Sequence, residues 1–156
     1  MKFTHLDSAG QARMVDVTDK QPTKRAATAS ATVVCDPEIL KRIASGEMPK
    51  GDVLAVARIA GIAAAKRTPE LLPLAHVIGV HGAAVDLTLG PESIEVVATV
   101  RTADRTGVEM EALTAASVAA LALIDMVKGL DRHAHIREVK LLAKEGGRSG
   151  SWRHDA

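Results

Sequence analysis

The residues with the clearest chemical potential are Asp125 and Lys128, which close a long apolar segment of the chain. Residues three apart lie on one face of an α-helix, so this carboxylate and this ammonium group can touch. At an exposed helix end they would form an ordinary ion pair that stabilises the fold very little. At a partly dehydrated subunit interface the pKa of the lysine would fall, and the aspartate could orient it for proton transfer. Spacing alone leaves both interpretations open.

Glu109 and Glu111 stand at the opposite end of the same segment. Carboxylates in the first turn of a helix stabilise it by facing the positive end of the helix dipole. Ionised carboxylates also accept hydrogen bonds without donating any, so they could bind the donor edge of a purine-like ligand. The pair is therefore either a helix-stabilising feature or part of a binding site.

Other candidates lie in loops and at helix ends. Lys50 precedes Gly51 in the sequence PKGDV, and is either a solvated loop lysine or a group that the glycine lets approach a ligand closely. Lys66 and Arg67 can complement the negative end of a helix dipole or bind phosphate groups. His76, in the mostly apolar sequence LPLAHV, is either a structural residue or a hydrogen-bond partner of a ligand.

The glycine-rich tail KEGGRSG adds Lys144 and Arg148, and it is either disordered or able to close over phosphates. Together, the candidate side chains are cations, carboxylates and one histidine at helix ends and in the adjoining loops. They suggest a site for a polyanionic small molecule, such as a nucleotide, at a subunit interface.

The composition argues against several classes of protein. The 20 basic and 19 acidic residues give a net charge of +1, which argues against a general nucleic-acid or membrane-surface partner. One Phe, one Trp and no Tyr leave too few aromatic rings to stack against the bases of a single strand. Neither a CxxC nor an HExxH sequence occurs, so we expect no metal site.

We expect a soluble cytoplasmic protein. Its single cysteine, Cys35, cannot form an internal disulfide, which fits a reducing compartment. The longest uncharged apolar run, residues 112–124, is only 13 residues long, whereas a membrane-spanning helix needs about 20. The N-terminal sequence also lacks the apolar segment of a signal peptide.

Hydrophobic periodicity and capping residues predict the order strand, helix, helix, strand, strand, helix, strand. The predicted elements cover residues 25–34, 35–47, 50–68, 77–89, 93–102, 111–128 and 135–144. This order is the split βαββαβ pattern of a ferredoxin-like α+β fold with one additional helix. The antiparallel sheet should carry its helices on one face. We expect one domain over residues 1–156, with flexible ends at 1–12 and 145–156.

Two of the predicted helices are apolar on most sides. A helix that lies on one sheet needs only one apolar stripe, yet no charged residue occurs between Glu111 and Asp125. In the preceding helix, Arg58 is the only charge between Asp52 and Lys66. A small domain with a single sheet does not easily cover such helices twice. We therefore expect neighbouring copies of the chain to cover them in a closed homo-oligomer.

Several blocks of the sequence resemble the cyclic pyranopterin monophosphate synthase family, also called the molybdenum cofactor biosynthesis protein C family. The resemblance covers residues 4–152. It is carried by the sequences MVDV (14–17), KGDV (50–53), ARIAGIAAAKRT (57–68), LLPLAH (71–76), TGVEMEALTAASVAAL (106–121), DMVK (125–128) and GGRSG (146–150). The combination is far more specific than an isolated glycine motif.

The resemblance implies a ferredoxin-like hexamer, a trimer of dimers, with active sites at a subunit interface and no cofactor. The implied reaction is a lyase step of molybdopterin biosynthesis. It converts (8S)-3',8-cyclo-7,8-dihydroguanosine 5'-triphosphate into cyclic pyranopterin monophosphate and diphosphate.

By position, the resemblance implies three catalytic residues, namely Asp125, Lys128 and Lys50. It implies substrate binding by Leu74, Ala75, His76, Glu109, Met110 and Glu111, and we expect Lys66 and Arg67 to bind phosphate. At 1.5 Å per residue Glu111 and Asp125, near the two ends of this helix, lie about 20 Å apart. One compact pocket cannot easily use both ends of one chain, so the two ends should serve different copies of the site.

The family has Cys-His-Pro where this chain has Ala75-His76-Val77. A proline restricts the residue before it, so His76 is expected to be less rigidly aimed here. The alternatives are a paralogue with altered activity, a non-catalytic nucleotide-sensing oligomer on the same fold, and a structural oligomer without a ligand. A sensor would tolerate loss of Lys50 and Lys128, and guanine nucleotides would not stabilise a structural oligomer.

Overall fold

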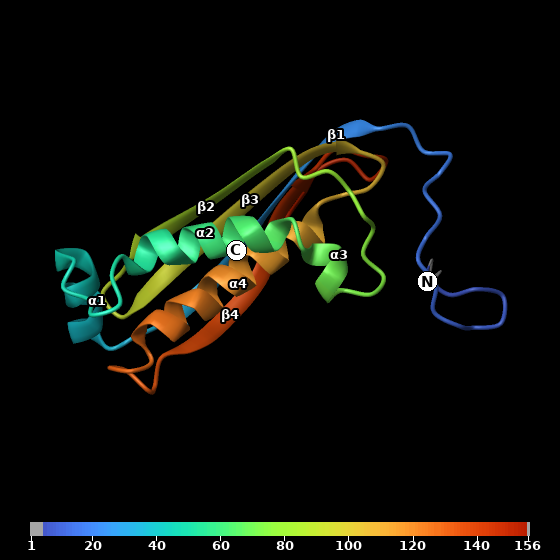
Figure 1. The fold of residues 1–156 in the computed structure, drawn as a ribbon. Helices are drawn as coiled ribbons and strands as arrows, with labels where there is room; N and C mark the ends of the chain where they lie inside the picture. Colours follow the sequence, from blue (N-terminus) through green and yellow to red (C-terminus); the bar gives the residue numbers. More distant parts are fainter. Residues whose placement is uncertain (1–4, 156) are drawn as a thin grey trace.

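The computed structural model describes residues 5–155 and shows one antiparallel sheet with its long helices on one face (Figure 1). Residues 1–4, part of the N-terminal segment expected to be flexible, lie outside the described residues, as does residue 156. The elements are β1 (Thr23–Val34), α1 (Pro37–Ser45), α2 (Val53–Ala65), α3 (Thr68–Leu71), β2 (Gly82–Leu89), β3 (Ser93–Asp104), α4 (Glu109–Val127), β4 (His135–Glu145) and β5 (Trp152–Arg153).

The sheet has the strand order β2-β3-β1-β4-β5, and every neighbouring pair is antiparallel. Apart from the short β5, this is the order that the split βαββαβ pattern produces. α2 lies in the crossover from β1 to β2, and α4 forms the crossover from β3 to β4. The predicted ferredoxin-like α+β fold is therefore confirmed; α1 is the predicted additional helix, and the short α3 is a second one that was not predicted.

The pairing of β1 with β3 decides which side chains face the helices. On the helix side the paired residues are apolar and buried; they are Ala27, Ala29, Ala31, Val33, Ile94, Val96, Ala98 and Val100. On the opposite face the hydroxyl oxygens of Thr28 and Thr99 lie 3.0 Å apart, and Thr32 donates to the Glu95 carboxylate at 2.7 Å. The sheet thus has one apolar face, which the helices cover, and one polar face.

Capping residues position the loop between α1 and α2. The Asp36 carboxylate accepts a hydrogen bond from Glu38 N at the start of α1, and the Asp52 carboxylate accepts one from Ala55 N at the start of α2. Gly46 ends α1 at φ 74°, a left-handed conformation that glycine adopts without strain. Because both ends of the loop are fixed in this way, its lysine, Lys50, has a defined place.

α2 and α4 pack together at close range. A Cβ atom added at Gly61 would lie 2.9 Å from the Ala115 carbonyl oxygen and 3.1 Å from the Ala119 Cβ atom. The outer sides of the two helices remain uncovered in this chain, since Ile59 is 68% exposed and Leu121 is 56% exposed. By length and composition alone α4 could span a membrane, but half of its apolar window is buried inside the fold, as in the core helices of soluble proteins.

Two predicted elements differ from the observed ones by three or more residues at one or both ends. The helix predicted over 50–68 ends at Ala65, and a separate helix, α3, begins at Thr68, because Pro69 suits the first turn of a helix. The strand predicted over 77–89 begins only at Gly82. Residues 77–81 form a loop that β3 holds through side chains: Thr102 Oγ1 donates to the Gly79 carbonyl at 2.6 Å, and His81 Nδ1 accepts from Ala103 N at 2.9 Å.

The C-terminal tail contains a strand that the sequence pattern does not predict. β5 lies within the segment 145–156, for which flexibility was expected, and Trp152 and Arg153 pair with Lys144 and Ala143 of β4. A strand of two residues is too short for hydrophobic alternation to reveal it. The pairing brings the glycine-rich tail back beside the sheet.

Candidate active site

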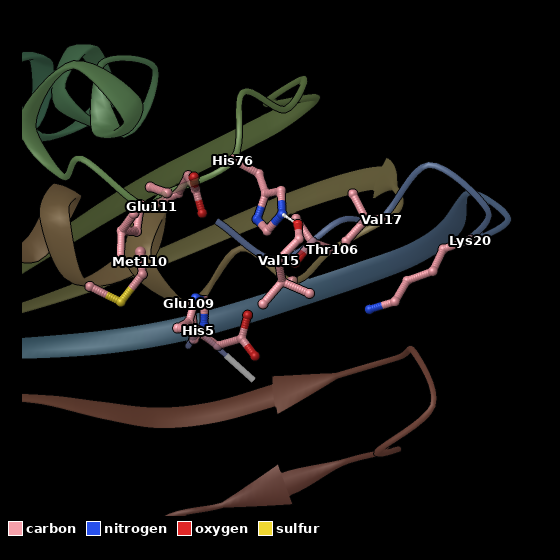
Figure 2. A pocket seen from close by; sticks show the side chains of 12 residues that line it. His5, Val15, Val17, Lys20, His76, Thr106, Glu109, Met110 and Glu111 are labelled. Atoms are coloured by element: carbon pink, nitrogen blue, oxygen red, sulfur yellow. Dashed lines mark hydrogen bonds between the residues drawn. The ribbon is translucent and has the colours of Figure 1, made fainter. Parts of the chain in front are cut away.

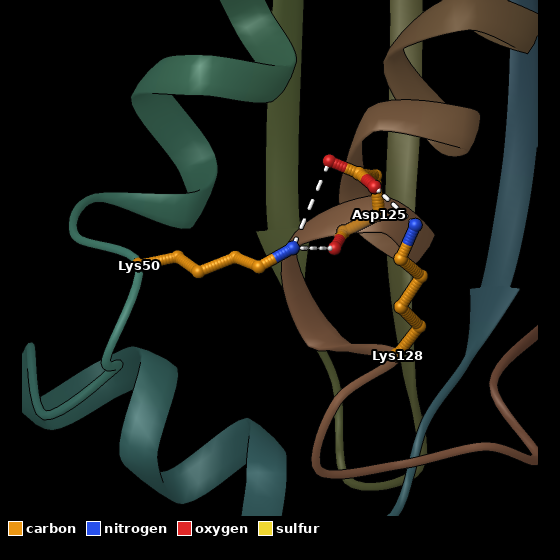
Figure 3. A network of polar contacts seen from close by, with 3 residues as sticks. All are labelled: Lys50, Asp125 and Lys128. Carbon is orange, nitrogen blue, oxygen red and sulfur yellow. Dashed lines mark hydrogen bonds and ion pairs between the residues drawn. The ribbon is translucent and has the colours of Figure 1, made fainter.

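The first group of candidate residues lies at the C-terminal end of α4 (Figure 3). Lys128 Nζ is 2.6 Å from Asp125 Oδ1. Lys50 Nζ donates to the Asp125 backbone carbonyl at 2.6 Å and lies 3.8 Å from Asp125 Oδ2. The structure thus brings together the three residues for which the resemblance implies catalysis. We call this group the lysine–aspartate cluster.

Local structure explains how the lysine–aspartate cluster forms. Asp125 occupies the last turn of α4 and Lys128 is the C-cap residue of the helix. The two residues are three positions apart, so their side chains lie on the same face. The last carbonyl groups of a helix lack helical partners, and Lys50 donates to one of them from the α1–α2 loop. Gly51 follows at φ 90°, a backbone conformation that favours glycine.

The cluster is open to solvent in the single chain, since the side chains of Lys50, Asp125 and Lys128 are 46%, 61% and 61% exposed. The hydrogen bond from Lys128, with the positive charges of Lys128 and Lys50, lowers the pKa of Asp125 below its usual 3.8. Two ammonium groups beside a carboxylate with a lowered pKa can bind an anion, and a lysine that has lost its proton can act as a base. The partial dehydration expected for this site requires a cover that this chain does not provide alone.

The second group of candidate residues surrounds a cavity of about 380 Å³ at the N-terminal end of α4 (Figure 2). The cavity is lined by His5, Val15, Val17, Lys20, Leu74, Ala75, His76, Thr106, Gly107, Glu109, Met110 and Glu111. Six of the predicted substrate-binding residues are therefore brought together: the 74–76 segment comes from the loop after α3, and the 109–111 segment opens α4.

Glu111 is the most unusual carboxylate in this cavity. It is only 3% exposed, and its burial, reinforced by the negative charge of Glu109, raises its pKa to about 7. A carboxyl group with such a pKa can donate or accept a proton near neutral pH. Glu109 differs, because Lys144 Nζ lies 3.5 Å from its carboxylate and provides a counter-charge. The carboxylate of Glu109 folds over Gly107, where a Cβ atom would overlap it.

His76 is held by the N-terminal segment. Its Nε2 lies 2.6 Å from the Val15 carbonyl oxygen (Figure 2). A carbonyl can only accept, so Nε2 must carry the proton of a neutral ring, and Nδ1 is left as an acceptor. The Val15 contact thus constrains the His76 ring in a chain that lacks the proline after this histidine.

Two cations near the cavity, Lys20 and Arg25, escaped the sequence-based prediction. Lys20 lines the cavity, and together with Arg25 and Arg148 it also lines a neighbouring one of about 430 Å³. Lys144 bonds both Glu109 and the Ser149 hydroxyl, so the tail folds back on this end of α4. The sequence indicates Lys144 and Arg148 as possible phosphate ligands. Lys20 and Arg25 follow the MVDV block and belong to none of the motifs, so no sequence signal indicated them.

Lys66 and Arg67 lie at the same end of the molecule but outside these cavities. Lys66 is the C-cap residue of α2 and Arg67 is the N-cap residue of α3, and both are exposed. Neither lines the cavities that hold His76 or Arg25. Among residues 5–155, no three His, Cys, Asp or Glu side chains are grouped so as to hold a metal ion.

The two groups of candidate residues are far apart within one chain. Glu109 begins α4 and Asp125 lies in its last turn, which places them roughly 24 Å apart at 1.5 Å per residue. A substrate the size of a nucleotide cannot contact both groups in one chain. We call the two groups candidate half-sites, because within one chain a ligand of this size contacts only one of them.

Comparisons with known proteins show the family of this chain. The MoaC family profile matches residues 14–147. This chain belongs to the MoaC family. A curated relative from Geobacter metallireducens, named cyclic pyranopterin monophosphate synthase, is 57% identical over 157 aligned positions, which cover 99% of this chain and 98% of the relative.

Relatives from distant bacteria carry the same name. The protein of Chloroflexus aurantiacus is 56% identical and covers 97% of this chain and 94% of its own length. The protein of Streptomyces avermitilis is 54% identical and covers 97% of this chain and 89% of its own length. The aligned regions thus span nearly the whole of this MoaC-family chain.

Proposed function

We propose that this chain is a cyclic pyranopterin monophosphate synthase, a cytoplasmic lyase of molybdenum cofactor biosynthesis. Its substrate would be (8S)-3',8-cyclo-7,8-dihydroguanosine 5'-triphosphate, and its products cyclic pyranopterin monophosphate and diphosphate. The single observation that carries the proposal is the grouping of the residues that the family resemblance picks out. In the fold they collect at the two ends of α4 as a lysine–aspartate cluster and a carboxylate–histidine cavity.

The complete site would form between two copies of the chain. The cavity of one copy would face the lysine–aspartate cluster of another. The separation of roughly 24 Å applies only within one chain, so one substrate could contact a cavity and a cluster from different copies. The exposed apolar side chains of Ile59 and Leu121 support such an assembly, because they offer uncovered surface between the two half-sites. A hexamer built as a trimer of dimers would complete the same site at every copy.

The cavity half-site suits the base-derived ring of the substrate. Glu109 and Glu111 can accept hydrogen bonds from its amine and amide groups, and His76 Nδ1 offers a further acceptor. The triphosphate would be neutralised by cations at this end of the molecule, which are Lys20, Arg25, Lys66, Arg67, Lys144 and Arg148. Their number suits a ligand with several negative charges.

The lysine–aspartate cluster would supply the proton transfers. Lys50 and Lys128 would exchange protons with the substrate as its first ring opens and the pterin ring closes. Asp125 would hold Lys128 in place, since its carboxylate stays ionised between the two ammonium groups. A sugar-derived hydroxyl would then attack the α-phosphorus to close the cyclic phosphate, and the bond from that phosphorus to diphosphate would break.

The direct test is turnover of the cyclised triphosphate, followed by diphosphate release and by the fluorescent pterin formed on oxidation of the product. Lys50→Ala and Lys128→Ala should lose at least about a hundredfold in kcat, the range of a general acid–base group. Both variants should keep the oligomeric state and thermal midpoint of the parent, because the side chains are exposed. Unchanged turnover by either variant would contradict its proposed role.

The alternative function is a non-catalytic nucleotide sensor on the same fold. A sensor would bind guanine nucleotides through the cavity and its cations, and its affinity would survive both lysine substitutions. It would release no diphosphate from the cyclised triphosphate under any condition. The product assay on the unsubstituted protein therefore separates the two functions.

A further inference from the structure

Asp131 is a buried carboxylate that the proposed chemistry does not use. It follows α4 and is 8% exposed. Its Oδ1 accepts hydrogen bonds from His133 N at 2.9 Å and Ala134 N at 3.1 Å. Its Oδ2 accepts one from Asp36 N at 2.8 Å. Burial opposes ionisation, but the three backbone donors outweigh burial and hold the pKa of Asp131 below 3.8, so the carboxylate is charged at neutral pH.

These three hydrogen bonds connect two parts of the chain that carry different members of the lysine–aspartate cluster. Asp36 is the N-cap residue of α1, the helix that leads into the loop of Lys50. The loop that contains Asp131 leaves α4 just after Lys128, and Asp131 N itself donates to the Val127 carbonyl at 2.9 Å. One carboxylate therefore fixes the start of α1 relative to the end of α4.

The relative position of α1 and α4 affects Lys50, because Lys50 donates a hydrogen bond to a backbone atom of α4. Lys50 Nζ donates to the Asp125 carbonyl at 2.6 Å, and this carbonyl belongs to the last turn of α4. The last turn of a helix frays readily when its carbonyl groups lose their partners. Fraying would move the acceptor of Lys50 and the Cα atom of Lys128 at the same time. A side chain that prevents fraying would therefore act on both lysines without touching either.

We propose that Asp131 is a positioning residue for the lysine–aspartate cluster, which holds Lys50 and Lys128 in register across the ends of α1 and α4. Its expected influence on turnover rests on the proposed function, whereas its influence on the geometry of the cluster does not. The competing explanation is a local staple of the α4–β4 loop that contributes stability alone.

The test compares Asp131→Asn and Asp131→Ala with the unsubstituted protein. Asparagine keeps the shape and one acceptor oxygen, but its amide nitrogen would meet a backbone donor, so it should lose either the Asp36 bond or the two loop bonds while the protein still folds. The first readout is the rate at which an amine-reactive acetylating reagent modifies Lys50 and Lys128, resolved by mass spectrometry. The second readout is steady-state kinetics with the cyclised triphosphate.

We expect Lys50 and Lys128 to be acetylated several-fold faster in both variants, relative to Lys66 at the far end of the molecule as internal reference. We expect kcat to fall by roughly 10- to 100-fold, the effect of a displacement of about 1 Å. KM should change little, because the cavity half-site is untouched. If acetylation changes as expected but the unsubstituted protein shows no turnover, the proposed function fails and the positioning role stands.

Asp104→Asn is the matched control, because the Asp104 carboxylate also accepts hydrogen bonds from two backbone donors, Gly79 N and Arg105 N, but lies at the other end of the molecule. It should leave the acetylation rates of Lys50 and Lys128 unchanged. Folded Asp131→Asn protein with unchanged acetylation rates and unchanged kcat would overturn the proposal. The same holds if Asp131 and Asp104 variants lose stability alike and neither changes the two lysines.

Discussion

Burial gives Glu111 an acid–base behaviour that its residue type does not suggest. Glu111 belongs to the first turn of α4 and its side chain is buried, whereas Lys144 forms an ion pair with the neighbouring Glu109. Asp125, in the other candidate half-site, lies beside Lys128 and Lys50, and its pKa is lowered. The two half-sites therefore hold carboxyl groups with opposite pKa shifts, a pattern that is typical of sites that need both an ionised group and a proton donor.

The raised pKa of Glu111 predicts a pH dependence of stability. A carboxyl group whose pKa rises from 4.5 to about 7 on folding binds its proton more tightly in the native state. Its contribution to stability is complete below pH 4.5 and is lost as the pH rises to 7. Glu111→Gln should remove this loss and raise the free energy of unfolding at pH 8 by up to about 3 kcal/mol.

Urea unfolding at pH 4 to 8 measures this effect. The Glu111→Gln and parent curves should nearly coincide at pH 4 and separate as the pH rises. Glu47→Gln, at an exposed position after α1, is the matched control and should follow the parent throughout. Equal separation of the Glu111→Gln and parent curves at pH 4 and pH 8 would show that Glu111 titrates normally.

At the residue scale, the sequence predicts some contacts of the candidate residues but not others. Asp125 and Lys128 are three positions apart, and helical spacing alone predicts their contact. The partner of His76 is a backbone carbonyl 61 residues away, in a segment without regular structure, so no local pattern could indicate it. The burial of Glu111 likewise depends on how the 74–76 loop and the N-terminal segment cover the start of α4.

At the element scale, α4 separates the two candidate half-sites, which lie at its two ends, and α2 packs against it. Their close packing depends on Gly61, whose missing side chain lets α2 approach the backbone of α4 at Ala115. The elements that sequence patterns predicted well, such as β1, β3 and α4, are long and strongly periodic. α3 and β5 were not predicted because four and two residues are too few to show a period.

Gly61→Ala should weaken the contact between the two helices. Its Cβ atom would lie 2.9 Å from a backbone oxygen of α4, and a backbone atom cannot rotate away. Overpacking of this kind costs about 1–3 kcal/mol, although alanine favours a helix over glycine by about 1 kcal/mol. We therefore expect a net loss in the free energy of unfolding, measured by urea denaturation.

Gly129→Ala is the matched control, because no atom lies within 4 Å of its added Cβ, and it should be neutral. A Gly61→Ala protein as stable as the parent would show that the helices can separate without cost.

At the scale of the whole molecule, the proposed site needs two copies of the chain, because the two candidate half-sites of one chain lie roughly 24 Å apart. Copies of the chain can complete one another if the cavity of one faces the cluster of the next. Sequence patterns pointed to this arrangement through the apolar helices and their polar ends, but they carry no information on which surfaces meet. The lysine–aspartate cluster is formed within one chain, since Lys50 and Lys128 both contact the same Asp125. This fact allows a test of how the half-sites combine.

Mixed oligomers of two inactive variants should recover activity only when the variants carry lesions in different half-sites. Lys128→Ala and His76→Ala chains, bearing different tags and co-expressed in equal amounts, should form intact sites at about a quarter of positions. The isolated mixed oligomer should therefore regain about a quarter of the parental kcat per site, measured as diphosphate release. Lys50→Ala mixed with Lys128→Ala is the control and should recover nothing, because every cluster then lacks one lysine. Recovery in the control, or no recovery in a mixed oligomer shown to contain both tags, would mean that the two ends of α4 do not serve one shared site.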